Sequence, residues 1–291
     1  MSDKILRAAA GDGSIRIFIA DGTETVTEGQ KIHNTTPVMT VALGRMLIGA
    51  AIMGSMLKND NDLITIQTNG DGDGGKITAT ADSKARVKAC LNNPNVDLPM
   101  INGQYDVPTA IGFGTLTVIK DMGLKEPYVG QVPLMSGEIA EDLTYYYSKS
   151  EQTPSAVGLG VVLDGNTVKK AGGIIIQMMP DGDDETAEKI EENLKKYGNI
   201  ATLLNSGMTT NDILNNIAGE FNPIVLDEIP MQYYCNCSRE KVEKALISIG
   251  KKEIAEILEQ DGQATLHCHF CNKDYLFTEN DLTEILKRSA Q

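Results

Sequence analysis

The sequence contains no tryptophan, and only 9 tyrosines and 5 phenylalanines among its 291 residues. Proteins that bind single-stranded nucleic acid stack bases on aromatic side chains, so this composition offers few candidates for that role. Positive charge is also scarce, because 26 basic residues stand against 40 acidic ones and the net charge is −14. Binding to phosphates needs a basic footprint, so we expect no nucleic acid partner.

Long apolar runs are also rare, and the clearest is Val38–Leu57. Its length raises the question of a membrane span. However, Arg45 lies inside it and polar strands are predicted on both sides. We therefore interpret it as the buried helix of a core, begun by Thr36 and Pro37, and expect no membrane partner.

Cysteine is scarce too, yet four of the five cysteines form two close pairs, Cys235-Asn-Cys237 and Cys268-His-Phe-Cys271. No apolar run follows Met1 to suggest a secretory signal, so we expect a cytoplasmic protein. In a reducing cytosol, clustered cysteines indicate metal or redox chemistry and not a disulfide scaffold. Thiolate pairs separated by a helix-sized spacer are typical of a tetrahedral sulfur site. Soft thiolates favour zinc or an iron–sulfur cluster.

The spacing within the first pair leaves alternatives open. The four cysteines could be ordinary buried thiols, a structural zinc site or a redox site. Structural zinc sites usually place two residues between paired cysteines, but one residue separates Cys235 from Cys237. A disulfide across that spacing closes a small, constrained ring, and constrained disulfides are the labile kind. The site therefore has two possible states: four thiolates on one metal, or two local disulfides without metal.

Three other side chains are candidate members of this site. His267 and His269 flank the second cysteine pair, and imidazole is a suitable zinc ligand. Since four cysteines are already available, we expect neither histidine to be a ligand. Cys90 stands apart from both pairs, and a lone cysteine usually behaves as a small apolar side chain, so we assign it no role.

A zinc ion would dominate the stability of the last 57 residues, Cys235 to Gln291. Structural zinc contributes roughly 10–16 kcal/mol to folding. A segment of this size is expected to have a net stability of only about 3–9 kcal/mol. We therefore expect the segment to unfold when the metal is lost.

The first 180 residues are predicted to be rich in strands, with inserted helices. Alternating apolar positions and flanking turn residues mark the strands. This pattern predicts an α+β domain. The predicted strands are Ile15–Ala20, Thr23–Thr27, Leu63–Thr68, Lys76–Ala81, Thr115–Lys120, Gln131–Leu134, Val157–Leu163 and Gly172–Met179, and the predicted helices are Val38–Leu57 and Glu138–Lys149.

The glycine-rich run Asn69–Gly75 resembles two ligand-binding loops only in part. A phosphate-binding loop would need Ser or Thr where Ile77 stands, and a helix after it. A calcium loop would need further ligands and a closing Glu beyond Asp71 and Asp73. We interpret the run as the turn of a β-hairpin.

The composition changes at Pro180, and a chain of this length allows two domains. Residues 181–230 contain 11 acidic and 3 basic residues, a net charge of 3 − 11 = −8. Helices are predicted at Glu185–Tyr197, Asn199–Asn205 and Thr210–Ala218, amphipathic but weakly packed. We predict a core domain at 1–180, an acidic helical linker at 181–230 and a small zinc-binding domain at 231–291.

The last segment has regular start and stop signals. Ser238 is a candidate N-cap for a first helix, which ends at Gly250, and a second helix stops near Gly262. Residues 264–277 are predicted to form a hairpin that contains the second cysteine pair. Thr278 and Asp281 form a capping pattern for a last helix.

These residues resemble a known family, the redox-regulated heat-shock holdases, or thirty-three-kilodalton chaperonins. The resemblance covers nearly the whole chain, and its most specific parts are the two cysteine motifs. The other matching stretches are Gly114–Asp121, Pro127–Gly130, Ser136–Asp142 and Ser150–Pro154.

The resemblance implies a molecular chaperone that is not an enzyme. In the reduced protein, Cys235, Cys237, Cys268 and Cys271 would hold one Zn²⁺ per chain, and the protein would be inactive. Under oxidative stress Cys235 would pair with Cys237 and Cys268 with Cys271, zinc would leave, and the linker would unfold. The active form, a homodimer, would then bind unfolding client proteins without ATP.

Two other functions, a zinc-ribbon adaptor and a zinc enzyme, are alternatives to the chaperone. A constitutive zinc-ribbon adaptor would keep its zinc under peroxide. A zinc enzyme would need an open coordination position, which four thiolates do not leave.

Overall fold

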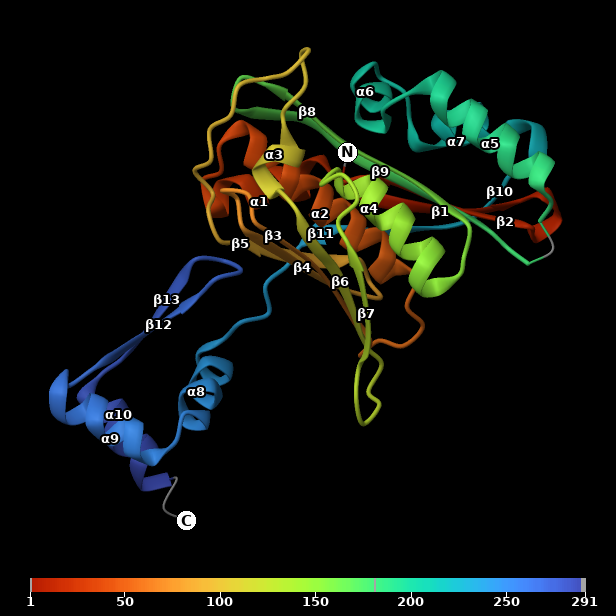
Figure 1. The fold of residues 1–291 in the computed structure, drawn as a ribbon. Helices are drawn as coiled ribbons and strands as arrows, with labels where there is room; N and C mark the ends of the chain where they lie inside the picture. Colours follow the sequence, from red (N-terminus) through yellow and green to blue (C-terminus); the bar gives the residue numbers. More distant parts are fainter. Residues whose placement is uncertain (1, 181, 289–291) are drawn as a thin grey trace. The chain divides into compact units, whose positions relative to one another are not determined.

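The computed structural model describes residues 2–180 and 182–288, and its contacts divide the chain after Tyr234 into two compact units. Each unit is described by itself (Figure 1). The strand-rich first unit, with its inserted helices, and the small second unit with its cysteine cluster confirm the predicted α+β fold class. The finer division at residues 180 and 230 stays a prediction.

Two antiparallel sheets form the first unit, with one parallel pairing at the edge of the second sheet. The first sheet has the order β10-β1-β2-β9-β8, from Ile224–Pro230, Lys4–Ala10, Ile15–Asp21, Thr167–Met178 and Ser155–Asp164. The second has the order β11-β5-β4-β3-β6-β7, from Gln232–Tyr233, Arg86–Leu91, Lys76–Asp82, Leu63–Gly70, Gly114–Asp121 and Tyr128–Pro133.

Helix α2 (Pro37–Ser55) is the centre of this unit and contacts both sheets (Figure 1). It is the one described helix long and apolar enough to cross a membrane, but 94% of that window is buried in the protein. The interpretation as a core helix is therefore confirmed. Arg45 forms an ion pair with Glu138, which precedes α4 (Ile139–Tyr146). The short helix α3 (Val107–Ile111) also packs on α2.

The strand predicted at Thr23–Thr27 is wrong, because these residues begin helix α1 (Thr23–His33). Its N-cap residue Gly22 has no side chain with which to cap the helix. Asp3 caps it instead: one carboxylate oxygen accepts from the Glu24 N–H at 3.0 Å and the other from the Thr25 N–H at 2.6 Å. Threonine and valine favour strands locally, but this distant carboxylate satisfies the helix start.

The glycine-rich run forms the predicted hairpin turn between antiparallel strands β3 and β4. Gly70 also lies opposite Gly114 of β6. A Cβ atom on Gly70 would lie 2.0 Å from the carbonyl oxygen of Ile111. These glycines therefore allow a close approach of backbones, and no phosphate loop is formed.

The predicted linker helices lie at α5 (Asp184–Tyr197), α6 (Ile200–Asn205) and α7 (Thr210–Ala218). They cover the face of the first sheet that points away from α2 (Figure 1). Beyond Ala218, where no helix was predicted, strand β10 joins the sheet beside β1. The expected weak packing is not found, because the helices bury Ile190, Ile200, Leu204, Ile213, Leu214 and Ile217.

The second unit contains helices α8 (Arg239–Ser248), α9 (Lys251–Gln260) and α10 (Glu279–Arg288) around hairpin β12–β13 (Ala264–Cys268 and Lys273–Phe277). The predicted caps are confirmed: the Ser238 hydroxyl accepts from the Lys241 N–H, and Thr278 and Asp281 bond to each other. The unit has a small core, whose buried apolar side chains are Leu246, Ile254, Phe277, Leu282 and Ile285.

Candidate metal centre

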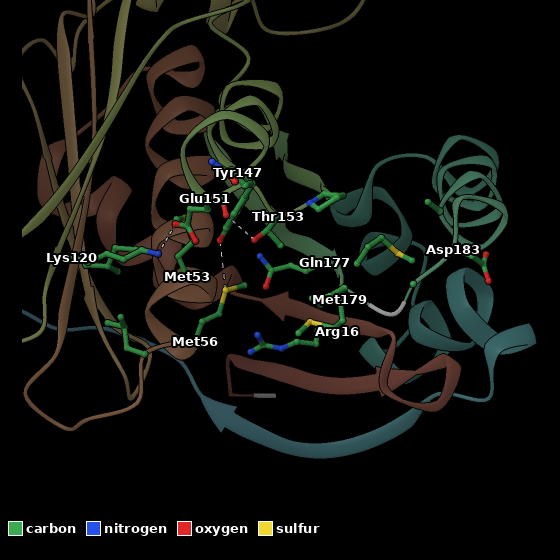
Figure 2. Close-up of a pocket in the computed structure, with 18 residues that line it drawn as sticks. Arg16, Met53, Met56, Lys120, Tyr147, Glu151, Thr153, Gln177, Met179 and Asp183 are labelled. Carbon is green, nitrogen blue, oxygen red and sulfur yellow. Dashed lines mark hydrogen bonds and ion pairs between the residues drawn. The ribbon is translucent and has the colours of Figure 1, made fainter.

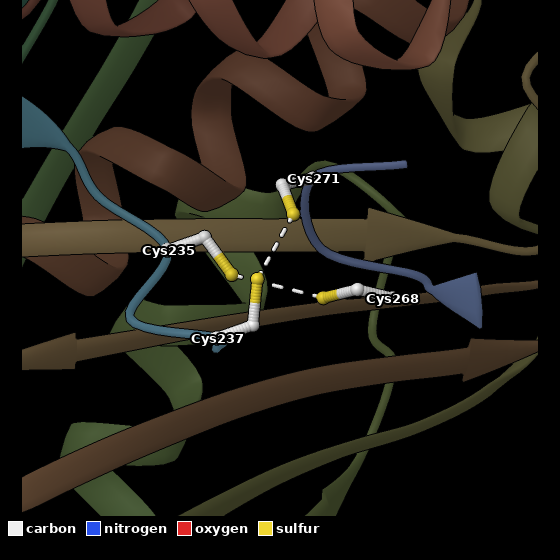
Figure 3. Close-up of side chains that lie close together, drawn as sticks. All are labelled: Cys235, Cys237, Cys268 and Cys271. Atoms are coloured by element: carbon white, nitrogen blue, oxygen red, sulfur yellow. Dashed lines mark hydrogen bonds between the residues drawn. The ribbon is translucent and has the colours of Figure 1, made fainter. Parts of the chain in front are cut away.

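The four clustered cysteines meet at one point of the second unit (Figure 3). Cys235 and Cys237 lie just before α8, Cys268 ends β12, and Cys271 lies in the hairpin turn. Their sulfur atoms all lie within 4.8 Å of one another, and all four residues are half-buried. Two segments more than thirty residues apart in the chain therefore supply one compact group of sulfur ligands.

The hairpin turn positions the second pair. The Cys271 N–H and the Asn272 N–H both donate to the Cys268 carbonyl, at 3.2 and 2.8 Å. Asn272 has a φ of 54°, a left-handed conformation that asparagine tolerates better than most residues. The turn thereby points the Cys268 and Cys271 side chains to the same place.

Arg239 connects the first pair to this hairpin. Its guanidinium donates to the Leu276 carbonyl at 2.6 Å and pairs with Asp281 at 2.9 Å. It also lies 4.4 Å from the centre of the Phe277 ring. Because Arg239 comes two residues after Cys237, these contacts hold the first pair against the hairpin.

The sulfur geometry fits one tetrahedral metal ion. The Sγ atoms of Cys235 and Cys268 are 3.7 Å apart, and those of Cys237 and Cys271 are 3.3 Å apart. A disulfide would need about 2.05 Å. Four sulfurs on a tetrahedron at the usual Zn–S distance of about 2.3 Å would lie about 3.8 Å from each other. The cluster can thus hold a metal ion, and its all-sulfur donor set suits zinc or another soft metal.

Comparison with known proteins identifies the family. The family described as "Hsp33 protein" matches residues 3–278. This chain belongs to the Hsp33 family. It is 47% identical to a 33 kDa chaperonin of Lachnoclostridium phytofermentans, over 99% of this chain and 100% of that protein. It is 48% identical to a 33 kDa chaperonin of Clostridioides difficile, over 99% of each.

A solved structure agrees with this assignment to the Hsp33 family. The crystal structure of the 33 kDa chaperonin, or heat shock protein 33 homolog, of Thermotoga maritima matches with a TM-score of 0.92 and 38% identity. The match covers 100% of this chain and 99% of that one. The family resemblance expected from the sequence is therefore confirmed, and with it a place among chaperones.

In this Hsp33-family chain the thiols differ in acidity. Burial opposes ionisation of Cys237, but hydrogen bonds from Tyr275 and the other cysteines outweigh it and lower its pKa to about 7. Burial, followed by the hydrogen bond to Cys237, raises the pKa of Cys271. Burial also raises the pKa of Cys235. Without a metal, Cys237 is thus the thiol most readily ionised in this trio.

The structure places the remaining sequence candidates outside this group. The Nδ1 atom of His267 lies 2.7 Å from Asp274, a contact that raises the His267 pKa. The His269 ring packs edge-on against the His267 ring. Within residues 2–180 and 182–288, the close group of ligand atoms includes neither histidine. Cys90 is half-buried on β5, in the other unit.

Two residues of the site escaped the sequence analysis, Arg239 and Tyr275. The Tyr275 hydroxyl lies 3.1 Å from the Cys237 sulfur. The hairpin register indicates that Tyr275 lies on the cysteine side. Tyr275 is opposite Leu266, and Leu266 lies on the same face of β12 as Cys268. The contacts of Arg239 had no comparable signal, since they depend on where β13 and α10 lie relative to the start of α8.

A separate cavity of about 630 Å³ lies in the first unit, beside the start of the linker (Figure 2). Four methionines are among its lining residues, and two of its ionic groups, Lys120 and Glu151, form an ion pair. The Tyr147 hydroxyl donates to the Met56 sulfur at 3.6 Å. Gly182, Asp183 and Ala187, from the predicted linker, form part of its wall.

Proposed function

We propose that this protein is a redox-regulated holdase, a chaperone that binds unfolding proteins without ATP. The observation that carries the proposal is the position of four convergent thiols in a unit with a very small core. In the reduced, inactive state Cys235, Cys237, Cys268 and Cys271 would bind one Zn²⁺ per chain. Oxidation of these ligands would release the ion and activate the protein.

The oxidation step balances with a peroxide as oxidant. Formation of two disulfides removes four electrons from the four sulfurs, and two molecules of hydrogen peroxide accept them and become water. We propose the pairs Cys235–Cys237 and Cys268–Cys271. Because all four sulfurs lie within 4.8 Å of each other, distance alone does not select the pairing, and mass mapping of the oxidised protein must decide it.

Loss of the metal would unfold the second unit because little else stabilises it. Five buried apolar side chains form its core. At about 1.5–3 kcal/mol for each, their burial is of the same order as the roughly 10–16 kcal/mol contributed by a structural zinc ion, before chain entropy is subtracted. The balance therefore depends on the ion.

The client surface in this proposal is the sheet face now covered by the linker. Helices α5–α7 bury a continuous apolar face. If the linker detached, this face would be available to apolar segments of many sequences, because hydrophobic contact is not directional. The large side chains that the first sheet buries in it are Leu6, Ile15, Ile17, Ile19, Ile174 and Ile176.

The remaining parts of the proposal concern organisation. The core at 1–180 would bind clients and dimerise, the linker at 181–230 would detach, and residues 231–291 would be the switch. The active form would be a cytoplasmic homodimer that acts on proteins, without catalysis and without a nucleic acid or membrane partner.

The test is light scattering by a client enzyme that unfolds and aggregates on heating. The zinc-loaded, reduced protein should leave aggregation unchanged, and the same sample after peroxide treatment should suppress it. Zinc content and thiol number are measured in parallel, and one zinc and four thiols per chain should disappear together. The Cys90→Ser variant is the matched control and should behave as the unmodified protein.

Two results would contradict the proposal. Equal protection before and after peroxide would exclude a redox switch. Retention of zinc in peroxide would favour the constitutive zinc-ribbon adaptor instead.

A further inference from the structure

The hydroxyl of Tyr275 lies beside one sulfur of the candidate metal centre. The distance from Tyr275 Oη to Cys237 Sγ is 3.1 Å, within the range of a hydrogen bond to sulfur. Strand β13 carries Tyr275, and the ring packs against the small core of the second unit. Because the ring is packed in this way, the hairpin holds the Tyr275 hydroxyl in one place beside the sulfur.

The sulfur ligands receive different donors. Cys235 accepts a hydrogen bond from the backbone N–H of Cys237, and Cys271 accepts one from the backbone N–H of Lys273. Cys237 has a side-chain hydroxyl, that of Tyr275, within hydrogen-bonding distance. A backbone donor is present whatever the side chain, whereas the hydroxyl donor to Cys237 exists because residue 275 is tyrosine.

A hydrogen bond to a thiolate changes its reactivity. It draws electron density from sulfur, and a less basic thiolate is a weaker nucleophile. Partners in the outer shell of a metal site adjust its ligands in the same way. A sulfur that accepts a hydroxyl hydrogen bond therefore reacts more slowly with an oxidant than the same sulfur without it.

We propose that Tyr275 is a positioning residue that sets the oxidant threshold of the metal centre through its hydrogen bond to the Cys237 thiolate. The inference rests on the proposed redox function. In the step it controls, the Cys237 sulfur attacks a peroxide oxygen, an S–O bond forms and the O–O bond breaks, leaving a sulfenic acid and hydroxide. A second thiolate then displaces hydroxide from that sulfur, which forms the disulfide.

The test compares zinc release from the full-length, zinc-loaded protein and its Tyr275→Phe variant. A coloured zinc chelator reports the release rate at a series of hydrogen peroxide concentrations. When the zinc release rate is plotted against peroxide concentration, the slope measures the reaction of the thiolates with peroxide. The intercept measures spontaneous dissociation of zinc. If the hydrogen bond changes thiolate basicity by one to two pK units, the slope should rise roughly 3- to 8-fold in the variant.

A spectroscopic measurement separates this role from a purely structural one. With Co²⁺ in place of zinc, the sulfur-to-metal charge-transfer band should move to lower energy in Tyr275→Phe, because the thiolate gives up electrons more easily. The control is Tyr128→Phe, which removes a hydroxyl 3.1 Å from Ser150 in the other unit. It should change neither the slope nor the band.

A slope within twofold of the unmodified protein, together with an unchanged cobalt band, would overturn the inference. If the unmodified protein shows no peroxide-dependent slope, the proposed redox function fails, while the cobalt band still tests the hydrogen bond. If Tyr275→Phe does not load metal, difluorotyrosine is incorporated at position 275 of the otherwise unchanged protein. Its stronger hydroxyl donor should lower the slope, and an unchanged slope there would overturn the inference.

Discussion

At the scale of single residues, two buried polar side chains, Asp3 and His33, connect distant parts of the first unit. Asp3 caps α1 from a position just before β1. His33, at the other end of α1, has its Nε2 atom 2.9 Å from the Ala89 carbonyl oxygen and 3.2 Å from the Tyr233 hydroxyl. Tyr233 lies near the end of the first unit, so this contact fixes the last residues of that unit.

Replacing Asp3 by alanine should destabilise the first unit by about 1–2 kcal/mol, because the N–H groups of Glu24 and of the buried Thr25 lose their acceptor. The measurement is the guanidinium midpoint of the first unit. Glu28→Ala is the matched control, since it removes a carboxylate from the exposed face of the same helix. An effect of equal size in both variants would contradict the capping role.

The stability of the first unit should fall as the pH decreases through about 6.5. Burial lowers the pKa of His33 below its ordinary value, so the unfolded chain takes up a proton at a higher pH than the folded one. The contribution of neutral His33 is complete above the unfolded pKa and is lost as the pH falls through the folded pKa. His33 is the one histidine among residues 1–234.

Denaturation between pH 5.0 and 7.5 measures this dependence. The variant His33→Gln keeps an amide donor near Nε2 but does not titrate, so its midpoint should change less over the same range. A pH dependence identical to that of the unmodified protein would assign the effect to other groups.

At the scale of elements, the linker helices and the first sheet form one apolar layer. Residues on its strands alternate between two faces: Phe18 and Ile175 point to the core around α2, while Ile17, Ile19, Ile174 and Ile176 point to the linker. Glycines make the close approach possible. A Cβ atom on Gly172 would lie 2.4 Å from the Leu204 side chain of α6.

Replacing Ile213 by alanine should therefore loosen the linker. Ile213 is fully buried on α7, and such a truncation costs about 2–5 kcal/mol. Hydrogen exchange of the α6 and α7 amides should accelerate in the reduced protein, and some protection of the client should appear without peroxide. Asn215→Ala, on the exposed side of α7, should change neither quantity.

Faster exchange without any client protection would mean that the sheet face under the linker is not the client surface. Unchanged exchange would mean that α7 does not hold the linker closed.

At the scale of the whole molecule, the two units differ in what stabilises their folds. The first unit has a core built on two sheets and α2, whereas the second has five buried apolar side chains and the cysteine cluster. Removal of the metal should therefore affect one unit and spare the other.

A chelator under reducing conditions, which prevents disulfide formation, tests this expectation. The amide signals of α8–α10 should lose their dispersion, while those of the first unit stay in place. Readdition of Zn²⁺ should restore them. A second unit that stays folded without metal would show that its apolar core is sufficient, and the proposed switch would then lack its physical basis.

Local signals were sufficient for the second unit. The two cysteine pairs, the caps at Ser238 and Thr278 and the hairpin between them are short-range patterns, and the structure has each of these elements where it was predicted. The same holds for α2, whose apolar length and Thr36-Pro37 start are properties of consecutive residues.

Distant contacts decided what the local patterns got wrong. Residues Thr23–Thr27 form a helix because Asp3, twenty residues away, caps it. The acidic linker packs firmly because the first sheet offers it a continuous apolar face, and no window of the linker itself contains that information.

The amino-acid sequence alone determined the family, the α+β class and the four thiols, because these depend on spacing and composition along the chain. The tertiary structure alone decided which face the linker covers, which carboxylate begins α1 and which hydroxyl lies against Cys237. The physical reason is that burial and hydrogen bonding act between atoms that folding brings together, and their sequence separation does not predict them.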